Sequence, residues 1–211
     1  MKNNKNQLDT IDEIKELMER SSQFRSIGGM SGIAAGIVAI TGAVILSLYL
    51  KVGLFEHASG IILTGRGQEP ASIRFIILLA LAVFILAAVL AVFLTSRNAK
   101  RKNLEFWGKP AHRVFINLFI FLLTGGIFCG ILLHYGIYFL IVPSMLVFYG
   151  LALINVSKFT LNEVAQLGIL EIVLGIVAAV IPVYPLLMWF IGFGILHLIY
   201  GVFVFIKYER Q

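Results

Sequence analysis

Long apolar runs alternate with short polar segments along most of the chain. Each run has about the 20 residues that a helix needs to cross the hydrocarbon core of a bilayer. The pattern therefore predicts an all-α membrane protein with six transmembrane helices. We expect them at Gly28 to Leu50, Ile73 to Leu94, Val114 to Leu133, Ile137 to Val156, Val164 to Val183 and Leu186 to Ile206.

Two of the connections between runs are too short to hold more than a turn. The third and fourth runs are separated by the residues His134, Tyr135 and Gly136, and the fifth and sixth meet around Pro182 and Pro185. Glycine accommodates a tight turn, and proline disfavours a helical conformation in the residue before it. We expect each pair to form a tight helical hairpin.

Residues 1–27 follow a different pattern and form a predicted cytoplasmic unit ahead of a transmembrane domain at 28–211. Apolar side chains recur there at helical spacing, and Thr10 and Glu13 have the form of a capping box, which predicts a short amphipathic helix. Its polar face is mostly acidic and therefore unsuited to anionic lipid. We expect residues 8–20 to contact a protein partner or a second copy, although a solvated interfacial helix explains the pattern equally well. The apolar positions are Leu8, Ile11, Ile14, Leu17 and Met18.

Composition and charge support the membrane interpretation and predict an orientation. Charged residues make up 13% of the chain, against about 25% in soluble domains. The net charge of +6 lies in short loops, so it does not indicate a nucleic-acid surface. Most Lys and Arg residues fall on the side that holds both termini, and only Lys51, Arg66 and Arg74 fall opposite. The positive-inside rule therefore predicts a multi-pass protein of the lipid bilayer with both termini in the cytoplasm.

The chain offers no pattern for a metal, a cofactor or a catalytic nucleophile. Its histidines lie at different levels of the predicted bundle and cannot converge on one ion. The single cysteine, Cys129, lies within an apolar run and is interpreted as a packing residue. No serine has a histidine in a matching region, so we do not expect an enzyme. The histidines are His57, His112, His134 and His197.

One carboxyl group interrupts the fifth apolar run. A charged side chain in hydrocarbon is costly, so Glu171 is expected either to be satisfied by a buried partner or to belong to a working site. His197 in the sixth run lies at a similar depth, roughly 10 to 14 Å from the cytoplasmic end at 1.5 Å per residue. Tyr149 and Tyr200 fall at comparable depth. These residues form a candidate buried polar site, interpreted first as a structural hydrogen bond between Glu171 and His197 and second as a proton-coupled or ligand-binding site.

Small residues recur at helical spacing in two of the predicted spans. Gly28, Gly32 and Gly36 stand at every fourth position of the first span, and Gly126 and Gly130 repeat the spacing in the third. Such rows allow helix backbones to approach closely. We expect them to pack against other helices of the same chain, with homodimerisation as the second interpretation.

Several segments resemble a family of small bacterial inner-membrane proteins that has no assigned activity. The resemblance extends over nearly the whole chain and rests on the segments "ERSSQFRSIGGMSGIAAGI", "TGGIFCGILL", "FYGLALINVSKFTLNE", "LGILEIVLGI" and "WFIGFGILHLIYG". It implies an inner-membrane location and no catalytic or ligand-binding residue. The last hairpin is also similar to the repeated two-helix unit of the HdeD-type acid-resistance membrane proteins, through Gly168, Gly175, Pro182, Gly192 and Gly201.

Two functions agree with these patterns. The first is a non-enzymatic scaffold or regulatory, stress-related membrane protein that presents its acidic N-terminal helix to a partner. The second is a small proton-linked transporter or channel that uses Glu171 and His197. A water-filled cavity at Glu171 favours transport, and a dry, packed bundle favours the scaffold.

Overall fold

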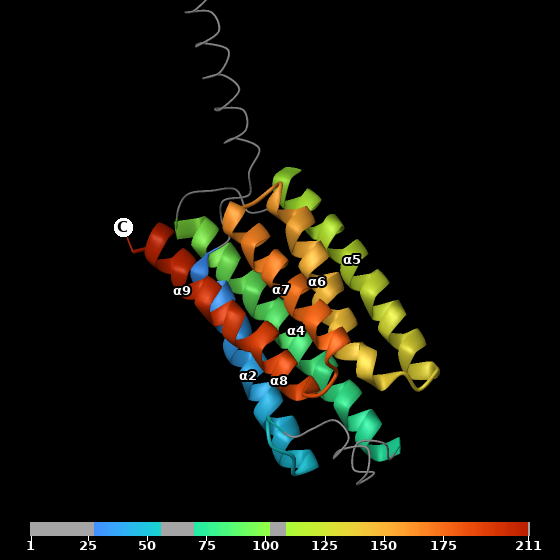
Figure 1. Cartoon of the computed structure of the whole chain (residues 1–211). Helices are drawn as coiled ribbons and strands as arrows, with labels where there is room; N and C mark the ends of the chain where they lie inside the picture. The colour runs from blue at the N-terminus through green and yellow to red at the C-terminus, as the bar shows by residue number, and fades with distance from the viewer. Residues whose placement is uncertain (1–27, 56–69, 102–108, 211) are drawn as a thin grey trace, which may run out of the picture.

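The chain folds into a bundle of long helices, shown by a computed structural model that describes residues 28–55, 70–101 and 109–210. Within these residues all regular structure is helical, and six helices are long and apolar enough to cross a membrane. The helices run side by side along a common direction (Figure 1). The protein is therefore an all-α, multi-pass membrane protein. The helix predicted within residues 1–27 lies outside the described residues.

Each predicted apolar run coincides with a helical span. Two spans begin or continue with a different helix type, a 3₁₀ turn in the fourth and a π-helix in the sixth. The spans are α2 (Gly29–Leu50), α4 (Pro70–Arg101), α5 (Lys109–His134), η1 (Tyr138–Leu140) with α6 (Ile141–Ser157), α7 (Asn162–Val180), and α8 (Pro185–Trp189) with η2 (Phe190–Leu196) and α9 (His197–Tyr208).

Several helix boundaries differ from those predicted, and helix α5, for example, begins at Lys109 rather than at Val114. Helix α4 continues to Arg101, well past Leu94, because the polar residues after the apolar run keep a helical conformation. Helix α7 ends at Val180 rather than at Val183. Ile181 precedes Pro182 and has a non-helical backbone conformation, as expected for a residue before proline.

The turn between α5 and α6 depends on one glycine. Gly136 has a φ of 71°, a left-handed conformation that favours glycine. Its N–H donates to the carbonyl of Leu133 at 3.2 Å, and the N–H of Ile137 donates to that of Leu132 at 2.8 Å. These bonds form a Schellman motif that ends α5 and reverses the chain. The predicted tight turn is present.

The packing divides the spans into two groups. Helix α7 packs most extensively against α6, and α5 packs on the other side of α6. Helix α2 packs against η2 and α9 of the last span and against α4. The two helices of the last hairpin are joined by a short turn, but α7 packs less extensively on the last span than on α6. We call the boundary between α7 and the last span the seam.

Glycines lie at the closest helix contacts. On α6 and α7, Gly150 and Gly168 face each other, and a Cβ built on either would lie 2.5 to 2.7 Å from the carbonyl oxygen of the other. Gly32 and Gly36 of α2 face the backbone of the last span at Gly201 and Gly194. Backbone contact of this kind is typical of small residues in membrane helices.

Three glycines do not pack as expected. Gly126 and Gly130 of α5 have no other group within 4 Å of a built Cβ, because α5 is an edge helix and this face points away from α6. Their predicted contact with another helix of the chain is therefore wrong for the described residues. Gly28 lies against the side chains of Glu209 and Asn98 rather than against a helix backbone.

A carboxylate joins the end of the last span to the beginning of the first. Glu209 follows α9, and its Oε1 accepts a hydrogen bond from the Gly29 N–H at 2.5 Å. The first N–H groups of a helix lack partners within the helix and attract negative charge. Glu209 therefore caps α2 at the end of the bundle where the C-terminus lies (Figure 1).

Candidate functional site

Helix α7 presents two carboxyl groups on the face that borders the seam. Glu163, Leu167 and Glu171 are spaced by four residues, which places them on one face of the helix. All three are buried, and Glu171 is 0% exposed. This burial is unusual, because acidic residues are almost never fully enclosed unless they are paired.

The Glu171 carboxyl group has a neighbour but no hydrogen bond. Its Oε1 lies 3.4 Å from Nδ1 of His197, a distance typical of an ion pair. Neither carboxyl oxygen has a hydrogen-bond partner among the described residues. The Oε2 atom lies against Gly192, where a built Cβ would approach it to 2.9 Å. Glycine at this position therefore leaves room for the carboxyl group.

His197 is oriented by two other groups. Its Nδ1 lies 3.1 Å from the carbonyl oxygen of Gly192, and its Nε2 lies 2.7 Å from the hydroxyl of Tyr149. A carbonyl oxygen can only accept, so Nδ1 carries a hydrogen, and in the neutral imidazole Nε2 then accepts from the Tyr149 hydroxyl. The imidazole and the Tyr149 ring stack with their centroids 5.3 Å apart.

The expected hydrogen bond between Glu171 and His197 is replaced by the bond from His197 to Gly192. The reason lies in η2, a π-helix that ends immediately before His197. Its wider turns change the path of the backbone, and the Gly192 carbonyl oxygen lies within reach of the imidazole. Such segments in helices are often found at functional sites. The apolar sequence of η2 contains no signal that predicts a π-helix.

Tyr200 lies near this group without a hydrogen bond to it. Its ring packs, together with that of Tyr149, against a buried cluster of Leu153, Val164 and Leu167. Its hydroxyl group is buried and has no hydrogen-bond partner among the described residues. The structure thus places Glu171, His197 and Tyr149 in contact and Tyr200 beside them, with its hydroxyl unpaired.

A second polar group lies nearer the C-terminal end of the bundle. Glu163 accepts hydrogen bonds from Lys207 at 2.5 Å and from the Tyr208 hydroxyl at 2.9 Å, both through Oε1. The Lys207 side chain is 49% exposed, whereas that of Glu163 is 8% exposed. Glu163 also lies in the first turn of α7, where a negative charge is favourable. In the sequence, Lys207 contributes only to the excess of basic residues on the side of the termini.

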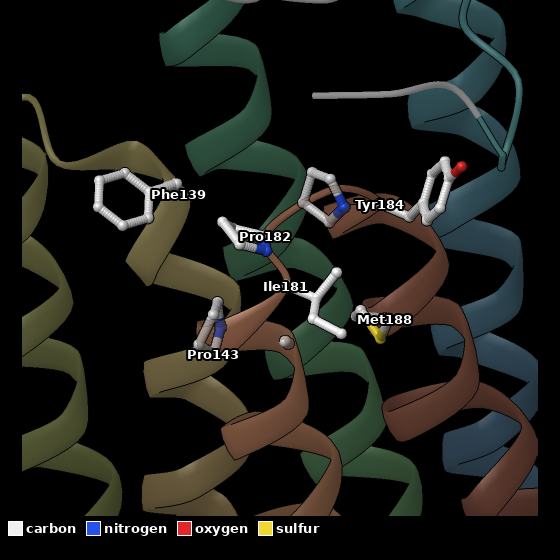
Figure 2. A pocket seen from close by; sticks show the side chains of 8 residues that line it. Phe139, Pro143, Ile181, Pro182, Tyr184 and Met188 are labelled. Carbon is white, nitrogen blue, oxygen red and sulfur yellow. The ribbon is translucent and has the colours of Figure 1, made fainter. Parts of the chain in front are cut away.

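A small cleft lies at the opposite end of the bundle, where α7 ends and α8 begins. Figure 2 shows Phe139 and Pro143 on one side of it and Ile181, Pro182 and Met188 on the other. Its volume is about 10 Å³, the size of roughly one water molecule. This cleft is too small for an organic ligand. Its other lining residues are Ala178, Tyr184 and Pro185.

The described residues contain no cluster suited to a metal ion. No group of three His, Cys, Asp or Glu side chains gathers in this part of the chain. His112 and His134 are exposed near different ends of α5, and His57 lies outside the described residues. Cys129 is partly buried, with its Sγ 3.8 Å from the Ile141 carbonyl oxygen, and lies between α5 and α6.

Comparisons with protein-family models, with curated proteins and with solved structures found no match to this chain. The resemblances noted from the sequence therefore stay predictions. At the seam a carboxyl group, an imidazole and a phenol lie in sequence, each beside the next. All three are groups that can carry a proton.

Proposed function

We propose that this protein is a non-enzymatic, proton-linked membrane protein, a small transporter or channel in which the Glu171 carboxyl group binds the proton. One observation supports this proposal above all others. The carboxyl group is fully enclosed, yet neither oxygen accepts or donates a hydrogen bond within the described residues. A purely structural acid in a membrane protein is expected to be paired with the groups that surround it.

The neighbours of Glu171 can deliver and remove a proton. The Tyr149 hydroxyl gives its proton to Nε2 of His197, and the imidazole passes the proton on Nδ1 to Oε1 of Glu171, 3.4 Å away. Tyr149 is reprotonated from the aqueous side. His197 is left neutral with its hydrogen on Nε2, and the reverse sequence releases the proton.

The position of the site also supports transport. Glu171 and His197 lie on opposite sides of the seam, where the contacts between helices are less extensive than those between α6 and α7 or between α2 and α9. Transporters often bind their coupling ions where two halves of the fold meet, beside interrupted helices. The π-helix of the last span departs from regular α-helical geometry beside this site, although the helix is continuous through it. Because Glu171 is fully buried, this conformation corresponds to an occluded state.

The scaffold hypothesis rests on different residues. It depends on the acidic helix predicted at 8–20, which lies outside the described residues. The enclosed side chain of Glu171 agrees with the dry, packed bundle expected of a scaffold. A scaffold, however, gives no reason for a buried carboxyl group without a hydrogen bond. We therefore rank proton-linked function first and use a flux measurement to separate the two.

Glu171→Gln is expected to abolish proton flux while the protein stays folded. Glutamine preserves the shape of the side chain but cannot bind and release a proton at neutral pH. The measurement uses purified protein in liposomes with a trapped pH-sensitive dye, an imposed pH gradient and a potassium–valinomycin potential. Wild type should acidify the interior faster than protein-free liposomes.

Glu209→Gln is the matched control for this flux experiment. It also replaces a carboxylate by an amide, but at the cap of α2, where the amide oxygen still accepts the Gly29 N–H. It should conduct as wild type does. Wild-type flux no greater than that of empty liposomes, or undiminished flux in Glu171→Gln, would overturn the proton-linked proposal and favour the scaffold.

We further propose that the protein resides in a bacterial inner membrane with both termini in the cytoplasm. The basis is the excess of Lys and Arg on the side of the termini. In a Cys129→Ser background, an impermeant thiol reagent applied to intact cells should label Phe55→Cys but not Arg210→Cys. Phe55 and Arg210 are both exposed, so accessibility in the folded chain does not limit the reaction. The opposite labelling pattern would show an inverted protein.

A further inference from the structure

The two carboxyl groups of α7 each meet a basic side chain of the last span. Glu171 lies beside His197, and Glu163 is paired with Lys207. The eight residues from 163 to 171 correspond to about 12 Å along a helix at 1.5 Å per residue. Glu171 is enclosed, whereas Lys207 is 49% exposed. Polar groups therefore lead from the C-terminal end of the bundle toward the buried site.

Tyr200 occupies the interval between these two pairs. It stands three residues after His197 and seven before Lys207, which places the three on one broad face of the last span. Its ring packs on the cluster of Leu153, Val164 and Leu167, and Leu167 lies halfway between the two carboxyl groups on α7. Its buried hydroxyl has no hydrogen-bond partner among the described residues. A buried hydroxyl without a partner is uncommon and marks a place that a water molecule or a moving proton can use.

We propose that Glu163, with Lys207 and Tyr208, is the entry of a proton route that reaches the Glu171 site through the Tyr200 hydroxyl. This inference rests on the proposed proton-linked function. A proton taken up by Glu163 passes to the Tyr200 oxygen while the Tyr200 hydroxyl proton passes toward Tyr149, directly or through one water molecule. Tyr149 in turn donates to Nε2 of His197.

The hydrogen bonds of Glu163 prevent it from taking up a proton in this conformation, so the entry of the route is closed. Its Oε1 accepts from both Lys207 and the Tyr208 hydroxyl, so the carboxylate is held in its charged form by two donors. It must separate from Lys207 before it takes up a proton. The half-exposed Lys207 side chain can move into water to allow this. The pair thus controls access from the C-terminal end.

Tyr200→Phe is the principal test, because it removes one hydroxyl and leaves the ring that packs on the cluster of Leu153, Val164 and Leu167. Proton flux in the liposome assay should fall by about tenfold or more, since positioned proton-transfer groups contribute factors of roughly 100 to 10,000. The melting temperature should stay near that of wild type, because the hydroxyl makes no hydrogen bond. Tyr138→Phe, at the other end of the bundle, is the matched control and should conduct normally.

Three further variants test the route and its entry and guard the experiment against misfolding. Tyr200→His restores a proton-carrying side chain and should conduct better than Tyr200→Phe. Lys207→Met releases Glu163 from its ion pair and should raise the flux driven by acid on the C-terminal side, measured with uniformly oriented protein. Glu163→Gln should lower the same flux.

The possible outcomes separate this route from the proposed function. If Tyr200→Phe conducts as fast as wild type while Glu171→Gln is inactive, the route through Tyr200 is wrong and proton transport through Glu171 stands. If Lys207→Met and Glu163→Gln both conduct as wild type, Glu163 is not the entry. Wild type without flux overturns both proposals.

Discussion

Glu171→Met is expected to unfold at a higher temperature than wild type and to conduct no protons. The wild-type carboxyl group is buried without a hydrogen bond, so its removal loses only the 3.4 Å approach to Nδ1 of His197 and relieves the cost of burying a polar group. That cost is about 1 to 3 kcal/mol for an unsatisfied buried group. Methionine is unbranched like glutamate and adapts to irregular space, which suits the narrow site beside Gly192. His197 keeps its contacts with Gly192 and Tyr149.

Glu163→Met is the matched control for this stability experiment. Glu163 lies on the same face of α7 and is also buried, but it accepts hydrogen bonds from Lys207 and Tyr208. Its replacement loses both bonds and should lower the melting temperature. Thermal unfolding in one detergent, followed by tryptophan fluorescence or by light scattering, compares the two variants directly. If Glu171→Met is destabilised as much as Glu163→Met, Glu171 makes a structural bond and its proposed role in proton binding loses its basis.

The expected changes in melting temperature are opposite because the carboxyl group of Glu171 is kept for function and that of Glu163 for stability. Proteins retain a costly buried group where activity requires it, and its removal then stabilises the fold. The two acids of α7 have the same residue type, the same helix face and similar burial. They differ in whether donors surround the carboxyl group. Sequence alone cannot reveal that difference, because it depends on contacts across the seam.

The spans themselves could be predicted from hydropathy because every backbone polar group in a bilayer must be satisfied within its own segment. Because of that requirement, a run of apolar residues in a bilayer forms a helix almost regardless of which other helices surround it. The packing between spans has no comparable rule. The short turn at Pro182 predicted that α7 and the last span would be close partners, yet α7 packs chiefly on α6. Gly168 and Gly175 accordingly lie against α6, at Gly150 and Pro143.

The candidate site could be predicted in part. Depth along antiparallel helices was enough to place Glu171 and His197 near each other, because a helix rises by a constant 1.5 Å per residue. Orientation around the helix axis was not predictable, since a π-helix shifts the register of every following side chain. For that reason the bond from His197 to Gly192 and the unpaired Tyr200 hydroxyl became visible only in the structure.

Alanine at Gly150 or Gly168 is expected to destabilise the bundle. Each glycine faces the carbonyl oxygen of the other, and a Cβ would approach that oxygen to 2.5 Å at Gly150 and 2.7 Å at Gly168. The obstacle is backbone, so no side-chain rotation relieves it and the helices must separate. Overpacking of this kind costs about 1 to 3 kcal/mol, and more where the contact is extensive, as it is between α6 and α7.

Gly126→Ala and Gly130→Ala provide the control for this prediction. Both glycines stand within α5, and a Cβ on either has no other group within 4 Å. Alanine there should leave the melting temperature unchanged or raise it slightly, because alanine favours a helix over glycine by up to about 1 kcal/mol. Melting temperatures in detergent and in liposomes measure all four variants. A loss of stability at Gly126 or Gly130 comparable to that at Gly150 would show that this face of α5 is covered in the membrane, as the homodimer interpretation requires. Equal tolerance at all four positions would contradict the close contact of α6 and α7.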